Sequence, residues 1–266
     1  MPGHILFLLS SKGHDPTELA IPHRQLTRAG FTISFATSDG QPAQADPILL
    51  GTGSFARVWG AGEEAREAYD ELLGVGAFKE PESWEKEGFD ILKYDAILLP
   101  GGDDQSIRPF LESSTLHAQL AKFWPYCSRS YPPSPPTSTS VPAPGRKVLA
   151  AICHGPLPLS FTHLPSGAPL LKGVHSTTLP KHFELTAWLG SQLWGMGGYY
   201  RTYGAEGRWC AGDVVAAGAR YVPGPWGPSP FVCVDPECRY VSARFPGDSW
   251  LFADKVGEEV RRALGG

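Results

Sequence analysis

Residues 149–156 have the sequence LAAICHGP, an apolar run followed by a cysteine, a histidine and Gly-Pro. This pattern is typical of a strand that delivers a nucleophile onto a sharp turn before a helix. Ala151 and Gly155, two residues to either side of Cys153, are small. The turn requires small residues at these two positions because a larger side chain would collide with the bent backbone. The thiol would lie at a helix N-terminus, where the dipole favours its ionised form. We therefore predict a nucleophile elbow at Cys153 with a lowered thiol pKa.

Short apolar runs alternate with helix-like segments along the rest of the chain. Such alternation is typical of α/β proteins with a mostly parallel, flavodoxin-like sheet that carries helices on both faces. In these sheets, sites form at the carboxyl ends of the strands. We expect strands at 5–9, 31–36, 95–99, 147–152, 231–234 and 239–243, and helices at 17–29, 62–73, 109–124 and 249–264.

Two segments interrupt this alternation within what we predict to be one domain, residues 1–266. Residues 128–145 consist largely of Ser, Pro and Thr. Such a segment cannot bury enough apolar surface to order itself, so we expect a flexible surface insertion. Residues 190–227 are rich in Gly, Trp, Tyr and Arg. We expect them to form an elaborated loop or a cap near the site, with a packed aromatic surface loop as the alternative.

Composition and charge exclude several functions. The 266 residues carry a formal net charge of −4 and no cluster of Lys and Arg, whereas a nucleic-acid surface needs clustered positive charge. No apolar stretch approaches the length that spans a bilayer, and the apolar run near the N-terminus is read as a first strand rather than a signal peptide. Five cysteines, an odd number, favour reduced thiols and a cytoplasmic protein. The expected partner is a small-molecule substrate, not a nucleic acid or a membrane.

A cysteine nucleophile needs help to lose its proton, because the thiolate is the reactive form. Besides the helix N-terminus, a nearby carboxyl group could accept the thiol proton, or could hydrogen-bond the thiolate while itself protonated. His154 is the third possibility. Adjacent residues at an elbow point in different directions, so its ring could instead turn toward a separate acid partner. The residues alone leave these geometries open.

Glu18 is the candidate carboxyl group. It lies in the first turn of the predicted helix 17–29, near the same sheet edge as Cys153, and Leu-Ala-Ile follows it. Such an apolar setting would raise its pKa toward the range useful for acid–base catalysis. In the alternative interpretation, the carboxylate merely interacts favourably with the helix dipole.

A pair of glycines, Gly101 and Gly102, follows the predicted strand at 95–99. Glycine lets the backbone approach a ligand closely. A backbone N–H at this turn, together with that of His154, could bind an oxyanion. Taken alone, a Gly-Gly pair is more often simply a turn.

With these residues in place, the chain resembles the ThiJ/PfpI superfamily, which has the class I glutamine-amidotransferase-like fold. It is nearer to the larger chaperone-glyoxalase branch. Motifs in the same order carry the resemblance and cover most of the chain outside the two interrupting segments. They are ELAIP at 18–22, RAGF at 28–31, DAILLPGG at 95–102, AICHGP at 151–156 and SARFPGD at 242–248.

The resemblance implies roles for individual residues. Cys153 would be the nucleophile and Glu18 its proton partner. The backbone N–H groups of Gly102 and His154, beside Gly101, would form the oxyanion site.

The acid partner of His154 differs between branches of the superfamily. The chaperone-glyoxalase branch implies that Glu184, later in the chain, is this acid. In the alternative interpretation, Glu184 is simply a solvent-exposed residue of a helix. In the protease-like branch, the acid comes from another subunit, at a position after the Gly-Gly turn. Here Asp103 and Asp104 lie near that position but do not align with the acid of that branch. A glutamine amidotransferase is disfavoured, because no His-x-Glu follows residue 184, late in the chain where that family has one.

The resemblance further implies an enzyme without cofactor or metal, and a homodimer. Its reaction would be that of a cysteine-dependent lyase or hydrolase on a small electrophilic carbonyl, nearest to a glutathione-independent glyoxalase. A tailoring enzyme of secondary metabolism, an isonitrile hydratase and, with weaker support, a peptidase are the enzymatic alternatives. The non-enzymatic alternative is a redox sensor or holdase chaperone, because an ionised cysteine is readily oxidised to sulfinic acid.

Overall fold

The computed structural model describes residues 3–129, 146–197 and 199–265. Its centre is a seven-stranded sheet in the order β10-β11-β7-β6-β1-β3-β5. The pairings are parallel except that β10 runs antiparallel to β11. This arrangement confirms the predicted flavodoxin-like fold class. The strands are β1 (His4–Leu8), β3 (Thr32–Thr37), β5 (Glu82–Ser83), β6 (Ala96–Leu99), β7 (Val148–Ile152), β10 (Val232–Val234) and β11 (Tyr240–Ala243).

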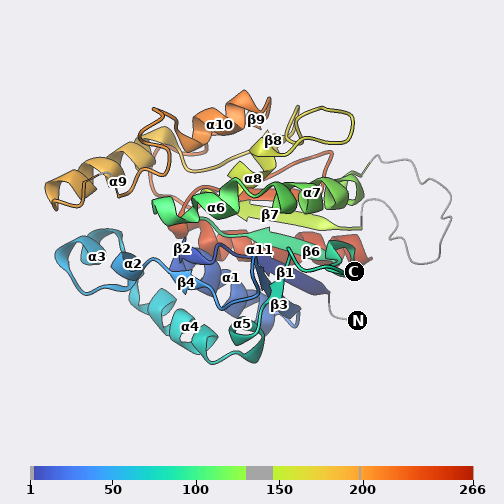
Figure 1. Ribbon diagram of the computed structural model, residues 1–266, viewed down its shortest axis with the longest axis horizontal. Helices are drawn as coiled ribbons and strands as arrows, with labels where there is room; N and C mark the ends of the chain where they lie inside the picture. Colours follow the sequence, from blue (N-terminus) through green and yellow to red (C-terminus); the bar gives the residue numbers. More distant parts are fainter. Residues whose placement is uncertain (1–2, 130–145, 198, 266) are drawn as a thin grey trace.

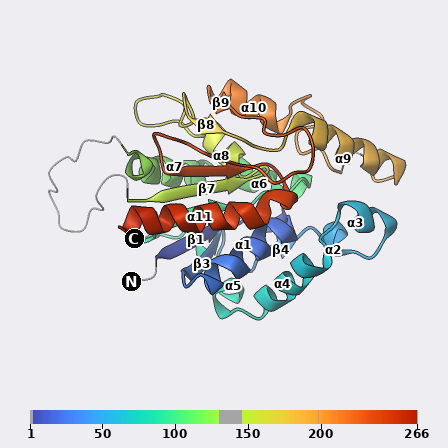
Figure 2. The same ribbon diagram turned by 180° about the vertical axis from the view of Figure 1, so that it is seen from behind.

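Helices cover both faces of the sheet (Figure 1, Figure 2). On one face, α1 (Pro16–Arg28) packs against α11 (Ser249–Leu264), and α11 contacts β7 and β11. On the other face, α7 (Ser114–Phe123) packs against α8 (Pro156–Phe161). Because both faces are covered, β6 and β7 are apolar and buried along their whole length, as is typical of parallel sheets.

Shorter elements surround the carboxyl ends of the strands. At this end of the molecule, on the left in Figure 1, α2 (Pro47–Leu50) and α3 (Ser54–Trp59) lie opposite α9 (Lys181–Leu193). Among the described residues, no helix is both long enough and apolar enough to cross a bilayer. The other elements are β2 (Lys12–His14), β4 (Gln44–Ala45), α4 (Glu63–Leu73), α5 (Gly76–Lys79), α6 (Arg108–Leu111), β8 (His175–Ser176), α10 (Cys210–Ala216), β9 (Arg220–Tyr221) and 3-10 turns at Ile91–Lys93, Gln105–Ile107, Trp124–Cys127 and Pro246–Asp248.

The six predicted strands and the predicted helices at 17–29 and 62–73 lie within one residue of their predicted bounds, and the last helix matches its prediction at 249–264. The short strands β2, β4, β5, β8 and β9 were not predicted. The single helix predicted at 109–124 is wrong, because the chain forms α6 and then α7 there. The Ser113 side chain accepts the Leu116 N–H at 3.2 Å and so caps a new helix. The apolar pattern runs across the break and hides this cap.

The structure describes one of the two interrupting segments almost completely and leaves most of the other outside the described residues. Residues 130–145 of the predicted insertion lie outside the described residues. The segment 190–227 holds the end of α9, all of α10 and β9, so it is more regular than a loop. Tyr200 and Tyr203 within it are buried.

Candidate active site

The elbow expected at Cys153 is present. Strand β7 ends at Ile152, Cys153 has a φ of 59°, and α8 begins at Pro156. Among the described residues, Cys153 is the one non-glycine residue with positive φ, a conformation that costs energy and is concentrated at functional sites. A Cβ atom on Gly155 would lie 2.1 Å from the Leu99 carbonyl oxygen. The close approach of the two backbones therefore explains the glycine.

Helix α1 places Glu18 beside the elbow. The Asp15 carboxylate caps this helix by accepting the N–H groups of Thr17 at 2.7 Å and Glu18 at 3.1 Å. The Glu18 side chain is buried, and its Oε2 accepts the Gly101 N–H at 2.9 Å. Burial raises the pKa of Glu18 well above its usual value, and the charges of Asp15 and Asp103 act in the same direction. The protonated form of Glu18 is therefore favoured relative to that of an exposed glutamate.

The expected lowering of the Cys153 pKa is wrong. Burial raises the pKa of this thiol well above its usual value, and the acidic side chains of Glu18 and Asp103 raise it further. Helix α8 does not offset this, because it has only six residues and its Pro156 and Pro158 supply no N–H. At rest Cys153 is thus a neutral thiol, 2 % exposed, in contact with the carboxyl group of Glu18.

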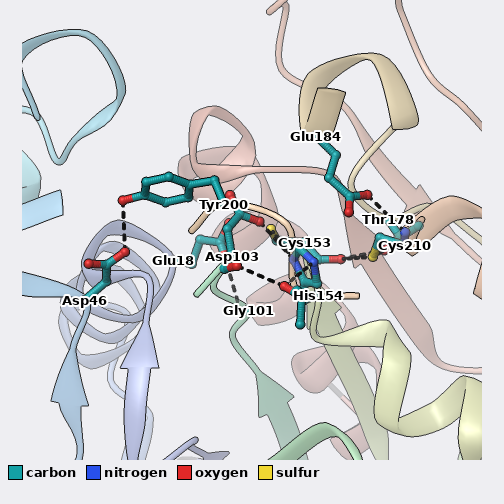
Figure 3. Close-up of polar contacts among 11 residues, drawn as sticks. Glu18, Asp46, Gly101, Asp103, Cys153, His154, Thr178, Glu184, Tyr200 and Cys210 are labelled. Atoms are coloured by element: carbon teal, nitrogen blue, oxygen red, sulfur yellow. Dashed lines mark hydrogen bonds and ion pairs between the residues drawn. The ribbon is translucent and has the colours of Figure 1, made fainter. Parts of the chain in front are cut away.

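His154 lies between an acid and a hydroxyl group, and Figure 3 shows it beside Cys153 and Asp103. Its Nδ1 is 3.1 Å from Asp103 Oδ1 and 3.5 Å from Cys153 Sγ. Its Nε2 is 3.1 Å from Thr202 Oγ1. The Thr202 hydroxyl donates its hydrogen to the Asp103 carbonyl oxygen at 2.9 Å, so it accepts from His154 and Nε2 carries a proton. Nδ1 faces both the Cys153 sulfur and the Asp103 carboxylate, so a proton that it takes from the thiol would be donated in a hydrogen bond to Asp103, with the ring as an imidazolium.

The charge of Asp103 prepares His154 to hold a second proton. Burial lowers the pKa of His154, but the contact with Asp103 outweighs burial, and the pKa is raised overall. An imidazolium formed by proton transfer from the thiol would be stabilised by the same carboxylate.

Glu184 is not the acid that contacts His154 in this structure. It lies in the first turn of α9, and its Oε2 accepts the Cys210 N–H at 3.0 Å, at the start of α10. Its charge reaches His154 only as one of the weaker contributions that raise the pKa of the ring. The acid beside the histidine is Asp103, which follows the Gly-Gly turn in the same chain.

The two glycines after β6 pack against the elbow. A Cβ atom on Gly101 would lie 2.5 Å from the His154 nitrogen, and one on Gly102 would lie 2.3 Å from the Gly13 carbonyl oxygen. Only glycine allows the backbone turns to approach this closely. Because the Gly101 N–H donates to Glu18, Gly101 serves here to hold the acid rather than an oxyanion.

Sequence reasoning left Asp103 unassigned and missed Thr202. For Asp103 there was a signal, because it directly follows a Gly-Gly turn at the carboxyl end of a strand. For Thr202 there was none: it lies 48 residues after His154 in a segment without a recognisable motif.

The segment after α9 reaches across to the start of α2. The hydroxyl groups of Tyr199 and Tyr200 each donate to Asp46 at 3.0 Å. The Tyr200 ring also stacks on Phe55 of α3, with 4.9 Å between ring centroids. These contacts place aromatic side chains next to the carboxyl ends of the strands, as Figure 3 shows for Tyr200 and Asp46.

A cavity of about 340 Å³ lies beside the site, between α3, α9 and the turn at 245–247. Two acidic residues, Asp15 and Asp103, contribute to its lining. One Asp103 carboxylate oxygen also lies within 4.8 Å of Cys153 Sγ, so the cavity and the nucleophile share this side chain. The rest of the lining is Leu49, Phe55, Val58, Trp59, Leu179, Phe183, Ala187, Tyr200, Pro228, Phe245, Pro246 and Gly247.

One group of side chains at the site could hold a metal ion. Asp103, Cys153 and His154 each bring one ligand atom within 4.8 Å of the others. The thiol would first have to lose its proton, because the thiolate is the form that binds metals. The expected absence of a metal stays a prediction.

The chain belongs to the ThiJ/PfpI family, since the family model described as ThiJ/PfpI family-like matches residues 9–225. An uncharacterized protein of Schizosaccharomyces pombe is 28% identical over 259 residues, which cover 97% of this chain and 84% of that protein. Among solved structures, the rapid encystment protein of Francisella tularensis has a TM-score of 0.67 at 17% identity, covering 98% of this chain and 99% of its own. Glyoxalase III from Candida albicans has a TM-score of 0.63 at 17% identity, covering 97% of both chains. At these identities, the solved structures support the fold alone.

Proposed function

We propose that this protein is a cofactor-free, cysteine-dependent enzyme that converts 2-oxoaldehydes into 2-hydroxy acids without glutathione. The observation that carries the proposal is the buried group of Cys153, Glu18 and His154, in which the thiol contacts a ring nitrogen and a carboxyl group whose pKa is raised by burial. The reaction needs one group to take the thiol proton and another to move a proton between two carbons. The similarity in fold to a glyoxalase III is consistent with this reaction class.

The first step joins the sulfur of Cys153 to the aldehyde carbon. His154 Nδ1 takes the thiol proton as the carbon–sulfur bond forms, and the aldehyde oxygen takes the proton of Glu18. The product is a hemithioacetal. It leaves Glu18 as a carboxylate and His154 as an imidazolium whose charge is stabilised by Asp103.

Glu18 then moves the proton between the two carbons. Its carboxylate removes the proton of the former aldehyde carbon, whose electron pair forms the double bond of an enediol, while the ketone oxygen takes the proton held by His154. Glu18 next returns its proton to the neighbouring carbon. As the thioester carbonyl forms, the hydroxyl on the first carbon gives its proton to His154. One carbon is oxidised and the other reduced, so no external oxidant is needed.

Water completes the cycle. The Glu18 carboxylate takes a proton from the water that attacks the thioester, and the departing sulfur takes the proton of His154. The 2-hydroxy acid leaves, and the thiol, the protonated Glu18 and the neutral ring are restored. The raised pKa of Glu18 suits this cycle because the group must hold a proton at the start and at the end.

Lactate formation from methylglyoxal without glutathione tests the proposal. We expect wild type to form lactate, Cys153→Ala to form none, and Glu18→Gln to lose at least about a hundredfold in kcat. Cys127→Ala is the matched control, because Cys127 is also a buried free thiol but lies before β7, away from its carboxyl end. Wild type without activity, or full activity in Cys153→Ala, would contradict the proposal.

The environment of Cys153 favours an enzyme over a redox sensor. A sensor cysteine combines a low pKa with exposure to solvent. Burial instead raises the pKa of Cys153, and the residue is 2 % exposed. We therefore expect peroxide to oxidise Cys153 no faster than an ordinary thiol.

A further inference from the structure

The cavity beside the site has an aromatic wall built from separate parts of the chain. Phe55 and Trp59 come from α3 and Phe183 from α9, while Tyr200 and Phe245 come from later segments. Aromatic side chains offer a large, rigid apolar surface, so they match an aromatic group better than a methyl group. The volume of about 340 Å³ lies within the range of small-molecule sites.

The wall is held in place by contacts among its own side chains. The Tyr200 ring stacks on Phe55 with 4.9 Å between centroids, and its hydroxyl is held by Asp46 at 3.0 Å. On the other side, the rings of Phe183 and Phe245 lie 4.7 Å apart. A cavity lined in this way keeps its shape without a ligand, which lowers the entropic cost of binding.

The charges around the cavity select against anions. Its acidic lining residues are Asp15 and Asp103, and among the described residues no Lys, Arg or His lines it. A carboxylate or phosphate group would find no cation there and would be repelled by Asp103 and, above the Asp15 pKa of about 7, by Asp15 as well, whereas an uncharged carbonyl compound would not. Because Asp103 also lies within 4.8 Å of Cys153 Sγ, it connects the cavity with the nucleophile.

We propose that this cavity binds the substituent of the 2-oxoaldehyde, and that the protein prefers an uncharged substrate with an aromatic or similarly bulky apolar group, such as an aryl glyoxal, over methylglyoxal. The carbonyl groups lie toward Asp103 and Cys153, and the ring packs against Phe55, Phe183 and Tyr200. The chemistry of this substrate class rests on the proposed function, whereas binding of the aromatic group does not.

Turnover provides the first test, with a variant that fills the cavity. Ala187 lines the cavity from α9, so Ala187→Phe would occupy the space of an aromatic substituent. Leu189→Phe is the matched control, because Leu189 lies on the same helix but is 49 % exposed and outside the lining. We expect wild type to favour phenylglyoxal over methylglyoxal by at least about tenfold in kcat/KM. Ala187→Phe should remove this preference while Leu189→Phe keeps it.

Binding provides the second test, without any reaction. We expect Cys153→Ala protein to bind acetophenone in calorimetry, and the added Ala187→Phe substitution to weaken this binding at least about tenfold. Binding without turnover of any 2-oxoaldehyde would sink the proposed function and support the cavity assignment. Turnover of methylglyoxal without aromatic preference or acetophenone binding would overturn the cavity assignment and leave the proposed function standing. Absence of both would overturn both.

Discussion

The Thr202 hydroxyl lies 3.1 Å from His154 Nε2 and donates to the Asp103 carbonyl oxygen at 2.9 Å. One side chain from outside the sheet thereby determines which nitrogen of the histidine carries the proton. The other nitrogen is left facing the Cys153 sulfur at 3.5 Å. The segment that follows α9 is thus part of the proton-transfer apparatus as well as a wall of the cavity.

Replacing Thr202 by valine keeps the shape of the side chain and removes the hydroxyl. The protonated Nε2 would lose its buried acceptor, which costs about 1–3 kcal/mol, so we expect kcat to fall by about tenfold or more. Thr202→Ser should retain most of the activity because the hydroxyl is kept. Equal kcat values for the valine variant and wild type would show that the contact does not orient the ring.

Replacing Asp103 by asparagine removes the charge that outweighs burial at His154. Burial alone lowers the pKa of a histidine, so the pKa of His154 should fall below that of wild type. We expect kcat to decrease by about a hundredfold, because the imidazolium formed during attack loses its partner. NMR titration of the ring measures the pKa directly. An unchanged titration would contradict the assignment of Asp103 as the acid partner.

The helix cap Asp15 predicts a dependence of stability on pH. Burial raises the pKa of Asp15 from 3.8 to about 7, so the folded protein binds this proton more tightly than the unfolded chain does. The resulting stabilisation is fully present below pH 3.8 and is lost as the pH rises through about 7. Asparagine caps a helix equally well but does not titrate.

Urea unfolding of wild type and Asp15→Asn at acid and neutral pH tests this dependence. We expect the difference in free energy of unfolding to shift in favour of the variant by on the order of 3 kcal/mol as the pH rises from about 4 to about 8. Parallel pH curves for the two proteins would show that the Asp15 carboxyl group does not titrate as its burial requires.

The close backbone packing at the elbow predicts that Gly155→Ala destabilises the protein far more than Gly76→Ala does. Gly155→Ala would place a Cβ atom 2.1 Å from the Leu99 carbonyl oxygen, and we expect a loss of at least about 3 kcal/mol in stability. Gly76→Ala is the control, because no atom lies within 4 Å of its added Cβ, and it should change stability by less than about 1 kcal/mol. Thermal unfolding of both variants measures the effect, and similar melting temperatures would argue against a tight elbow.

The features that sequence alone predicted have local causes. The apolar run at 147–152 followed by Cys-His-Gly-Pro was sufficient to place β7, the turn at Cys153 and the small residue at Gly155. In the same way, the apolar neighbours of Glu18 predicted a raised pKa, because they lie in the same helical turns and are buried with it. The homodimer inferred from the resemblance stays a prediction.

The features that sequence missed depend on segments brought together by the fold. The raised pKa of Cys153 follows from its burial and from Glu18 and Asp103, which come from α1 and the end of β6. No local sequence pattern predicts that these three residues lie close together. The contact of Thr202 with the histidine ring likewise joins segments that are distant in the sequence. The sequence contained one sign of the raised Cys153 pKa. The two prolines of α8 supply no N–H groups and so weaken the effect of its N-terminus on the thiol.

Native mass spectrometry of Glu18→Gln protein with phenylglyoxal tests most directly whether Cys153 attacks the aldehyde. Without the Glu18 carboxylate, the hemithioacetal cannot transfer its carbon-bound proton. We therefore predict that one intact substrate molecule adds at residue 153, that mandelate forms at least about a hundredfold more slowly than in wild type, and that the adduct is absent when Cys153→Ala is added. An adduct of the same mass and yield in the double variant would contradict the account.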